Sequence, residues 1–200
     1  MNQRALLSMV LLCAALLGCG GKRDAGHEPF LARDISSASY GKDFSLTDHL
    51  GQSRRLADFR GKVVVLFFGY THCPDVCPTT LADMALALRQ LGADAQNVQV
   101  LFATVDPERD TQAVLAQYVP SFNPSFLGLR GDAAVTAATA KEFRVFYQKR
   151  QTGSEAGYTM DHTAGTYVFD RSGRLRLFLG YGQGADAVAH DLKVLLRENP

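Results

Sequence analysis

Two cysteines, Cys73 and Cys77, are the residues of this 200-residue chain whose type and spacing best suit chemistry. They lie between an apolar, β-branched and aromatic run at residues 63–68 and a segment of helical periodicity at 81–91. This pattern predicts a buried strand, a short loop and a helix, with both thiols at the helix N-terminus. Unpaired N–H groups and the helix dipole favour thiolate there, and thiolate is both the nucleophile and the soft-metal ligand. The pair therefore predicts electron exchange, attack on a peroxide or metal binding.

The other segments indicate the elements that must position these thiols. Strands are expected near residues 44–47, 54–56, 62–69, 98–105, 126–129, 166–170 and 175–179, and helices near 78–90, 111–118, 132–143 and 186–197. Residues 144–150 are expected to be extended and 151–159 to form a polar excursion. Cysteines at the first strand-to-helix junction, with a hairpin and a helix closing the chain, match an α/β, thioredoxin-like fold. We expect a central mixed sheet flanked by helices, with an N-terminal β-hairpin and an inserted strand and helix.

A histidine far downstream, His162, separates the three chemistries. It precedes the last hairpin, where disulfide exchangers of this fold keep a cis-proline, and no proline lies between Pro124 and Pro200. Two thiolates and an imidazole suit copper, whereas zinc more often has a fourth ligand or a catalytic water. We therefore expect His162 to be a ligand rather than a structural histidine, although thiol–disulfide exchange stays open.

Three motifs together resemble the Sco/SenC family of copper chaperones: YTHCPDVCPTTL at residues 70–81, VDPERDT at 105–111 and DHTAGTY at 161–167. The resemblance covers about residues 38–198. It implies that Cys73, Cys77 and His162 bind Cu(I) or Cu(II), and that the two cysteines form a redox-active disulfide when copper leaves. It also implies delivery of copper to the CuA centre of cytochrome c oxidase subunit II, with another periplasmic copper chaperone as a candidate donor.

The leading hypothesis is thus a metallochaperone rather than an enzyme with turnover. The alternative is a thiol–disulfide oxidoreductase that keeps acceptor cysteines reduced, and a copper sensor or resistance protein without an oxidase client also stays open. A peroxidase is disfavoured, because the attacking cysteine of peroxiredoxins follows Thr or Ser at −3 and Pro at −7. Cys73 has Tyr70 and Leu66 at those positions.

The remaining histidines are expected to lie away from the site. Neighbouring residues of an extended loop point apart, so His72 is not expected to join Cys73 as a ligand. His27, His49 and His190 are expected at the surface.

Roles are also expected for three carboxylates, and two of them have an alternative role. Asp106 is expected to cap the next helix, with an approach to the cysteine loop as the alternative. Asp75 is expected to accept backbone N–H bonds at the helix start. Asp161 is expected to be a bystander, with orientation of His162 as the alternative.

The N-terminus resembles that of a bacterial lipoprotein. Arg4 precedes an apolar run at residues 5–17, too short for a stable transmembrane helix, and Leu-Leu-Gly-Cys19 resembles a lipobox. We therefore expect a signal peptide over residues 1–18, lipidation of Cys19, a tether over 19–38 and the copper-binding domain over 39–198. The predicted location is the bacterial periplasm or cell envelope, anchored to a membrane, and which membrane stays open.

The charge balance and the number of cysteines bear on the class of ligand and on the role of the cysteine pair. Without residues 1–18 the chain carries 20 basic and 20 acidic residues, which gives no electrostatic case for nucleic-acid binding. Only Cys73 and Cys77 remain in the predicted domain, and a disulfide across so short a loop would restrain little of the unfolded chain. The pair is therefore expected to serve chemistry and not to staple the fold.

Overall fold

The computed structural model describes residues 29–153 and 157–198. The predicted signal peptide, Cys19 and His27 lie outside the described residues. Among the described residues, no helix combines the length and the apolar character needed to cross a membrane.

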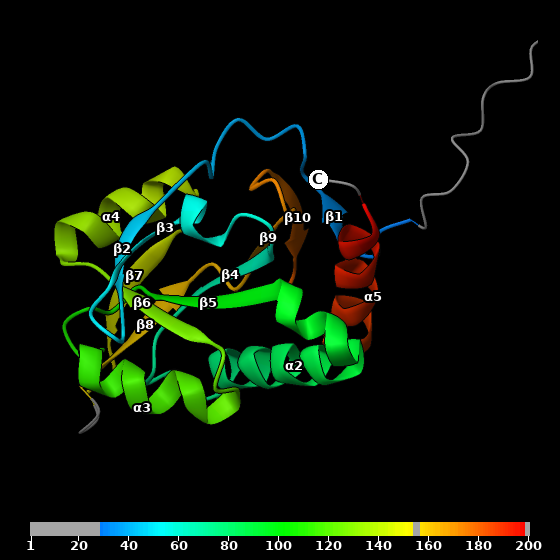
Figure 1. Ribbon diagram of the computed structural model, residues 1–200. Coiled ribbons are helices and arrows are strands. Elements are labelled where there is room, and N and C mark those ends of the chain that lie inside the picture. The colour runs from blue at the N-terminus through cyan, green and yellow to red at the C-terminus, as the bar shows by residue number, and fades with distance from the viewer. Residues whose placement is uncertain (1–28, 154–156, 199–200) are drawn as a thin grey trace, which may run out of the picture.

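The core is a mixed sheet of eight strands within these two ranges (Figure 1). Across the sheet the order is β1 (Arg33–Asp34), β10 (Leu175–Leu179), β9 (Thr166–Phe169), β4 (Val63–Gly69), β5 (Val98–Thr104), β6 (Leu127–Arg130), β2 (Ser45–Asp48) and β3 (Ser53–Arg55). Strands β4, β5 and β6 run parallel, and β9 is antiparallel to β4. Every residue of β4 and β5 is buried, as expected for strands covered on both faces. The carboxyl ends of β4 and β5 lie side by side, with Gly69 paired to Thr104.

Four α-helices and two short 3-10 helices cover the described sheet. They are α2 (Val76–Leu91), α3 (Gln112–Phe122), α4 (Ala133–Glu142), α5 (Gly184–Arg197), η1 (Leu56–Phe59) and η2 (Gly92–Asn97). Figure 1 shows α2 and α3 along one face of the sheet and α4 on the other. Helix α2 begins within the cysteine loop, between Cys73 and Cys77, and contains Pro78 in its first turn. It ends at Leu91 and is followed by Gly92, whose φ of 59° suits glycine.

The predicted elements are largely confirmed, including both hairpins and the inserted β6 and α4. Helix α3 is longer than expected and continues past residue 118 to Phe122, where the rings of Tyr118 and Phe122 pack 5.2 Å apart. Its N-cap is Thr111, whose side chain accepts the Val114 N–H. The expectation that Asp106 caps this helix is therefore wrong.

A second sheet was not expected. It consists of β7 (Tyr147–Gln151) and β8 (Tyr158–His162), antiparallel, with Tyr147 opposite His162. Part of the predicted polar excursion is thus strand, and His162 ends a strand instead of lying in a loop. Most of the β7 side chains are exposed, so neither strand shows the alternation of apolar and polar residues that marks a half-buried strand.

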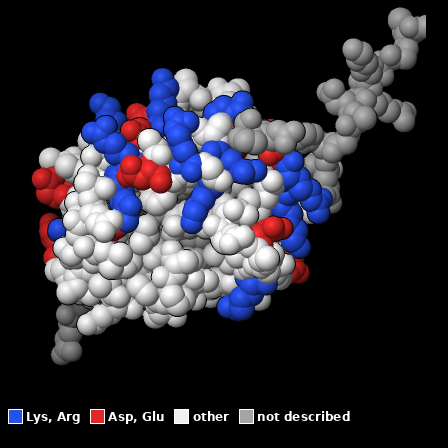
Figure 2. Space-filling view, viewed as in Figure 1, with Lys and Arg blue, Asp and Glu red and all other residues white. Residues whose placement is uncertain are grey.

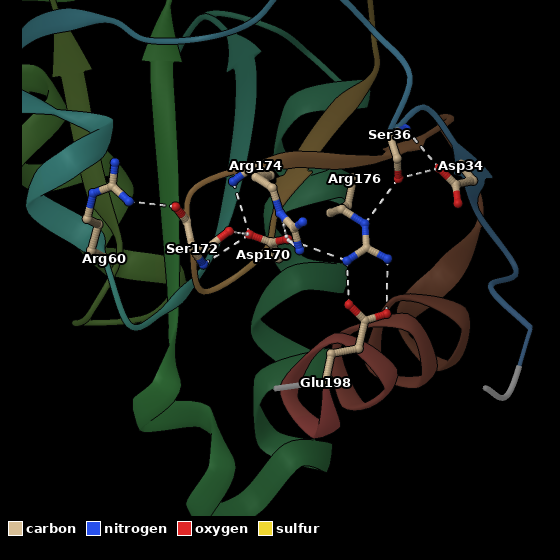
Figure 3. Close-up of polar contacts among 8 residues, drawn as sticks. All are labelled: Asp34, Ser36, Arg60, Asp170, Ser172, Arg174, Arg176 and Glu198. Atoms are coloured by element: carbon tan, nitrogen blue, oxygen red, sulfur yellow. Dashed lines mark hydrogen bonds and ion pairs between the residues drawn. The ribbon is translucent and has the colours of Figure 1, made fainter. Parts of the chain in front are cut away.

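The N-terminal edge of the domain is clamped to its C-terminal part. The buried carboxylate of Asp191 on α5 accepts the N–H groups of Leu31 (2.8 Å) and Ala32 (2.7 Å), and β1 then pairs with β10. Nearby, Arg176 contacts Ser36, Asp170 and Glu198 (Figure 3). The tether expected over residues 19–38 therefore overlaps the folded domain, which includes β1.

Charged side chains are unevenly distributed over the surface. Figure 2 shows Lys and Arg gathered over the upper and right parts of the view, with few charges below, where α2 and α3 lie. The sequence explains this distribution, because no charged residue occurs between Asp110 and Arg130. The surface formed by α3 is accordingly uncharged.

Candidate metal centre

The three predicted ligands converge. The ligand atoms of Cys73, Cys77 and His162 all lie within 4.8 Å of one another, and no other described residues form such a group of His, Cys, Asp or Glu. Cys77 Sγ lies 3.5 Å from His162 Nε2, and the Cys77 N–H donates to Cys73 Sγ at 3.4 Å. Cys77 is fully buried, whereas Cys73 and His162 are partly exposed. The cluster is therefore reached from the side of Cys73 and His162.

A glycine makes room for the buried sulfur. Gly69 ends β4, and a Cβ atom at this position would lie 2.8 Å from Cys77 Sγ and 2.8 Å from the Phe102 ring. Real Cβ atoms do not approach other heavy atoms so closely. The missing side chain thus allows Cys77 to lie directly against the strand end.

The His162 ring is held in one tautomer by the backbone. Its Nδ1 lies 3.0 Å from the carbonyl oxygen of Thr163, which can only accept a hydrogen bond, so Nδ1 carries the proton. The lone pair is then on Nε2, the atom that faces Cys77. Asp161 does not take part, because its carboxylate pairs with Arg150 at 2.8 Å. The alternative role of Asp161 in orienting His162 is therefore wrong.

The pKa values of the two thiols are shifted in opposite directions. The Cys77 side chain is the main cause that lowers the pKa of Cys73 to about 3, opposed by burial and helped by His162 and by the N–H groups of Asp75 and Cys77. The Cys73 side chain, together with burial, raises the pKa of Cys77. Cys73 is thus a thiolate at neutral pH, and Cys77 is a thiol.

A buried carboxylate that the sequence did not single out anchors the cysteine loop. Asp110 accepts hydrogen bonds from Thr71 N (3.0 Å), Thr71 Oγ1 (2.6 Å) and Thr104 Oγ1 (2.5 Å). Burial raises the pKa of Asp110, with these hydrogen bonds opposing the effect. The sequence contains one signal that could have identified Asp110. If β4 and β5 are parallel neighbours, the turn after β5, which contains Asp110, must lie beside the cysteine loop after β4.

Asp106 and Asp75, two of the carboxylates discussed from the sequence, contact residues other than the metal ligands. Asp106 pairs with Arg109 Nε at 2.6 Å and accepts the Tyr158 hydroxyl at 2.9 Å, so it does not approach the cysteine loop as a ligand. Asp75 is the N-cap residue of α2, but its side chain makes no capping bond and instead accepts the Thr79 hydroxyl at 3.3 Å. The capping role expected for the Asp75 side chain is wrong.

The remaining histidines described by the structure are not members of the three-residue cluster. His72 is exposed and does not join the three-residue group, as expected. His49 is buried, and its Nδ1 accepts the Gly128 N–H at 3.0 Å, so its predicted surface position is wrong. His190 is half-buried beside Asp191 on α5.

Fold and site together define the class of protein: a thioredoxin-like protein whose strand-to-helix loop joins two cysteines to a histidine. The SCO1/SenC family model matches residues 32–197, so the chain belongs to the SCO1/SenC family. The family resemblance and the thioredoxin-like fold inferred from the sequence are both confirmed.

Individual relatives agree with this assignment. The bovine mitochondrial SCO2 homolog is 36% identical over 195 residues, which cover 92% of this chain and 73% of that protein. Bradyrhizobium japonicum ScoI, solved with copper bound, superposes with a TM-score of 0.72 at 43% identity, covering 79% of this chain and 100% of that one. BsSco, described as having a disulfide switch and as belonging to the Sco family of cytochrome c oxidase assembly proteins, shares the fold (TM-score 0.61, 20% identity, 86% and 98% coverage).

Proposed function

We propose that this protein is a copper metallochaperone that binds copper through Cys73, Cys77 and His162 and delivers it to the CuA centre of cytochrome c oxidase during assembly. One observation carries the proposal: three soft or borderline ligand atoms from two distant parts of the chain lie within 4.8 Å of one another. The copper bound by the similar ScoI, and the assembly role given for the family of BsSco, support it.

The donor set fits copper cargo. Cys73 already offers a thiolate, His162 offers a lone pair at Nε2, and Cys77 would release its proton when a metal binds. A set of three ligands leaves room for an incoming ligand from the acceptor. The partly exposed Cys73 is the sulfur that this incoming ligand would approach.

Transfer of copper by ligand exchange requires an acceptor and a donor protein. Subunit II of the oxidase, through its CuA domain, is the acceptor, and another periplasmic copper chaperone is a candidate donor. Lipidation of Cys19 would tether the protein to a membrane face of the cell envelope.

A titration of the purified protein with Cu(I) and Cu(II) under reducing conditions tests copper binding. We expect one equivalent to bind, with a strong thiolate-to-copper absorption in the Cu(II) form. His162→Ala should lower the affinity by more than about 100-fold, because removing a ligand costs more than removing its supporting partner. His190→Ala, which changes a histidine on α5, is the matched control and should bind like the wild type. Equal affinity of the His162→Ala and wild-type proteins would refute the ligand set.

The alternative, a thiol–disulfide oxidoreductase, is favoured by the pairing of a partly exposed thiolate with a buried thiol. The Cys73 thiolate would attack an acceptor disulfide and release one acceptor thiolate. Cys77, once deprotonated, would then attack the Cys73 sulfur, releasing the second acceptor thiolate and leaving a Cys73–Cys77 disulfide. A dithiol reductant must reduce this disulfide before the next cycle.

Oxidase assembly in cells separates the two functions. His162→Ala removes a metal ligand but keeps both thiols, so it should abolish assembly if the protein delivers copper. Cys73→Ser should abolish assembly under either function. Normal assembly with His162→Ala alongside failure with Cys73→Ser would therefore favour the oxidoreductase.

A further inference from the structure

We propose that His72 is a transient copper ligand, which takes the ion as it enters or leaves the cluster of Cys73, Cys77 and His162. This inference rests on the proposed copper-binding function and adds the route by which the ion is exchanged. It follows from the position of His72, from the hydrogen bonds that fix its ring, and from the exposure of that ring.

His72 is the exposed imidazole that is adjacent in sequence to a cluster ligand. It precedes Cys73 directly in the loop, and its side chain is 53% exposed. Cys77, in contrast, is fully buried. An ion arriving from solvent, or leaving for a partner, is therefore accessible to Cys73 and to the exposed His72 ring while the second sulfur is covered.

A chain of hydrogen bonds fixes which nitrogen of His72 is available. The hydroxyl of Thr71 donates its single proton to the carboxylate of Asp110, with 2.6 Å between the oxygens. The same hydroxyl lies 3.1 Å from His72 Nδ1 and has no second proton to give, so it must accept from Nδ1–H. The lone pair of His72 is then on Nε2, a nitrogen through which neutral histidine binds metals.

This arrangement resembles the support that metal-binding histidines usually have. A buried acceptor, here Asp110 acting through Thr71, holds the protonated nitrogen and fixes the orientation of the ring. None of the described residues forms a hydrogen bond with His72 Nε2. A structural role for His72 would need only its Nδ1–H, whereas a role in transfer needs Nε2.

Substitution with asparagine separates the two roles. The side-chain amide of His72→Asn can still donate to Thr71 from near the position of Nδ1, but it has no atom at the position of Nε2. Thr71→Val makes the complementary change, because it keeps the imidazole and removes the hydroxyl that fixes its tautomer. Comparison of melting temperatures and circular dichroism would show that both variants fold.

The test measures copper transfer with the purified full-length protein. Cu(I)–glutathione serves as donor and bicinchoninate as acceptor, with loading and release followed by stopped-flow absorbance. We expect His72→Asn to slow both steps by about tenfold, since a barrier change near 1.4 kcal/mol is enough for that. Its equilibrium affinity and its Cu(II) spectrum should match the wild type. Thr71→Val should slow transfer less, because His72 Nε2 remains and the Thr71 N–H still bonds to Asp110, while the hydroxyl that fixes the tautomer is lost.

Two results would overturn the inference. Unchanged loading and release rates in His72→Asn would show that Nε2 plays no part in transfer. Loss of a nitrogen coupling from the Cu(II) electron paramagnetic resonance spectrum of His72→Asn would make His72 a permanent ligand instead. Failure of the wild-type protein to bind copper would refute the proposed function itself, which is a separate outcome.

Discussion

Cys77 Sγ and His162 Nε2 lie 3.5 Å apart, although 85 positions separate the two residues in the chain. Cys77 belongs to the first turn of α2 and His162 ends β8, which is part of the smaller sheet. The candidate site therefore exists only while this sheet is docked against the cysteine loop. Metal binding and native packing are linked for that reason.

Copper should stabilise the fold through this link. One equivalent of Cu(I), at a free concentration 100 times the dissociation constant, should add about 2.7 kcal/mol to the free energy of unfolding. Thermal unfolding with and without buffered Cu(I) would measure the effect. In His162→Ala the same copper concentration should produce a much smaller rise in melting temperature, and an equal rise would contradict the ligand assignment.

Cys73 should be reactive over an unusually wide pH range. Its pKa of about 3 lies far below the ordinary thiol value of 9.0, so the thiolate fraction is already complete at pH 5. Alkylation of the metal-free protein by iodoacetamide, followed by mass spectrometry, should give a Cys73 rate that is flat from pH 5 to pH 8. Cys77→Ala removes the side chain that is the main cause of this low pKa, and the rate should then fall at low pH. A tenfold rise per pH unit in the wild type would disprove the thiolate assignment.

Gly165 should tolerate no side chain. A Cβ atom here would lie 2.0 Å from the Phe178 ring, and this glycine is three residues beyond His162. Gly165→Ala should lower the free energy of unfolding by about 1–3 kcal/mol, the usual cost of overpacking, and weaken copper binding by displacing His162. Gly180→Ala is the matched control, since a Cβ at that position meets nothing within 4 Å. Equal stability of the two variants in urea unfolding would count against the packing account.

Asp48 should make stability depend on pH. Burial of its carboxylate raises the pKa, but hydrogen bonds from Gln52 N–H, Arg54 and Leu50 N–H outweigh burial, so the pKa is lower in the folded protein than in the unfolded chain. The stabilisation is therefore complete above the unfolded pKa near 4 and is lost as the pH falls through the folded value.

Asp48→Asn should accordingly destabilise the protein at pH 7, by about 1–3 kcal/mol, and the deficit should shrink below pH 4. Urea unfolding from pH 3 to pH 7 would measure it. Asp94→Asn, at an exposed carboxylate, is the control for removing one negative charge from the surface. A deficit that stays constant across this pH range would contradict the proposed role of the charge.

The buried centre of the fold could be predicted from the sequence because its signals are local. Strand β4 is an unbroken apolar run and β5 a largely apolar one, and Asp132, at the start of the helix expected over 132–143, caps α4 by accepting the Val135 N–H at 2.8 Å. Strand β8 could not be predicted in the same way, since it pairs only with the exposed β7 and carries no regular alternation.

Roles decided by tertiary contact were harder to predict. Asp106 and Asp110 belong to one turn, and no local pattern shows that only Asp110 lies under the cysteine loop. His49 is another example, because its burial depends on a hydrogen bond to Gly128, 79 positions away. Asp161 was weighed as a partner of its neighbour His162, yet the strand geometry directs it to Arg150 across the hairpin.

The clamp that joins β1, β10 and α5 also has a mechanical consequence. A force applied to the chain ahead of residue 29 acts first on Leu31 and Ala32, whose N–H groups are bound by Asp191. It then acts on the hydrogen bonds between β1 and β10. Two strands, β10 and β9, separate β1 from β4, which leads into the cysteine loop. We expect force spectroscopy from this end to detach β1 before copper is lost, so that tension on a tether leaves the metal ligands unstrained.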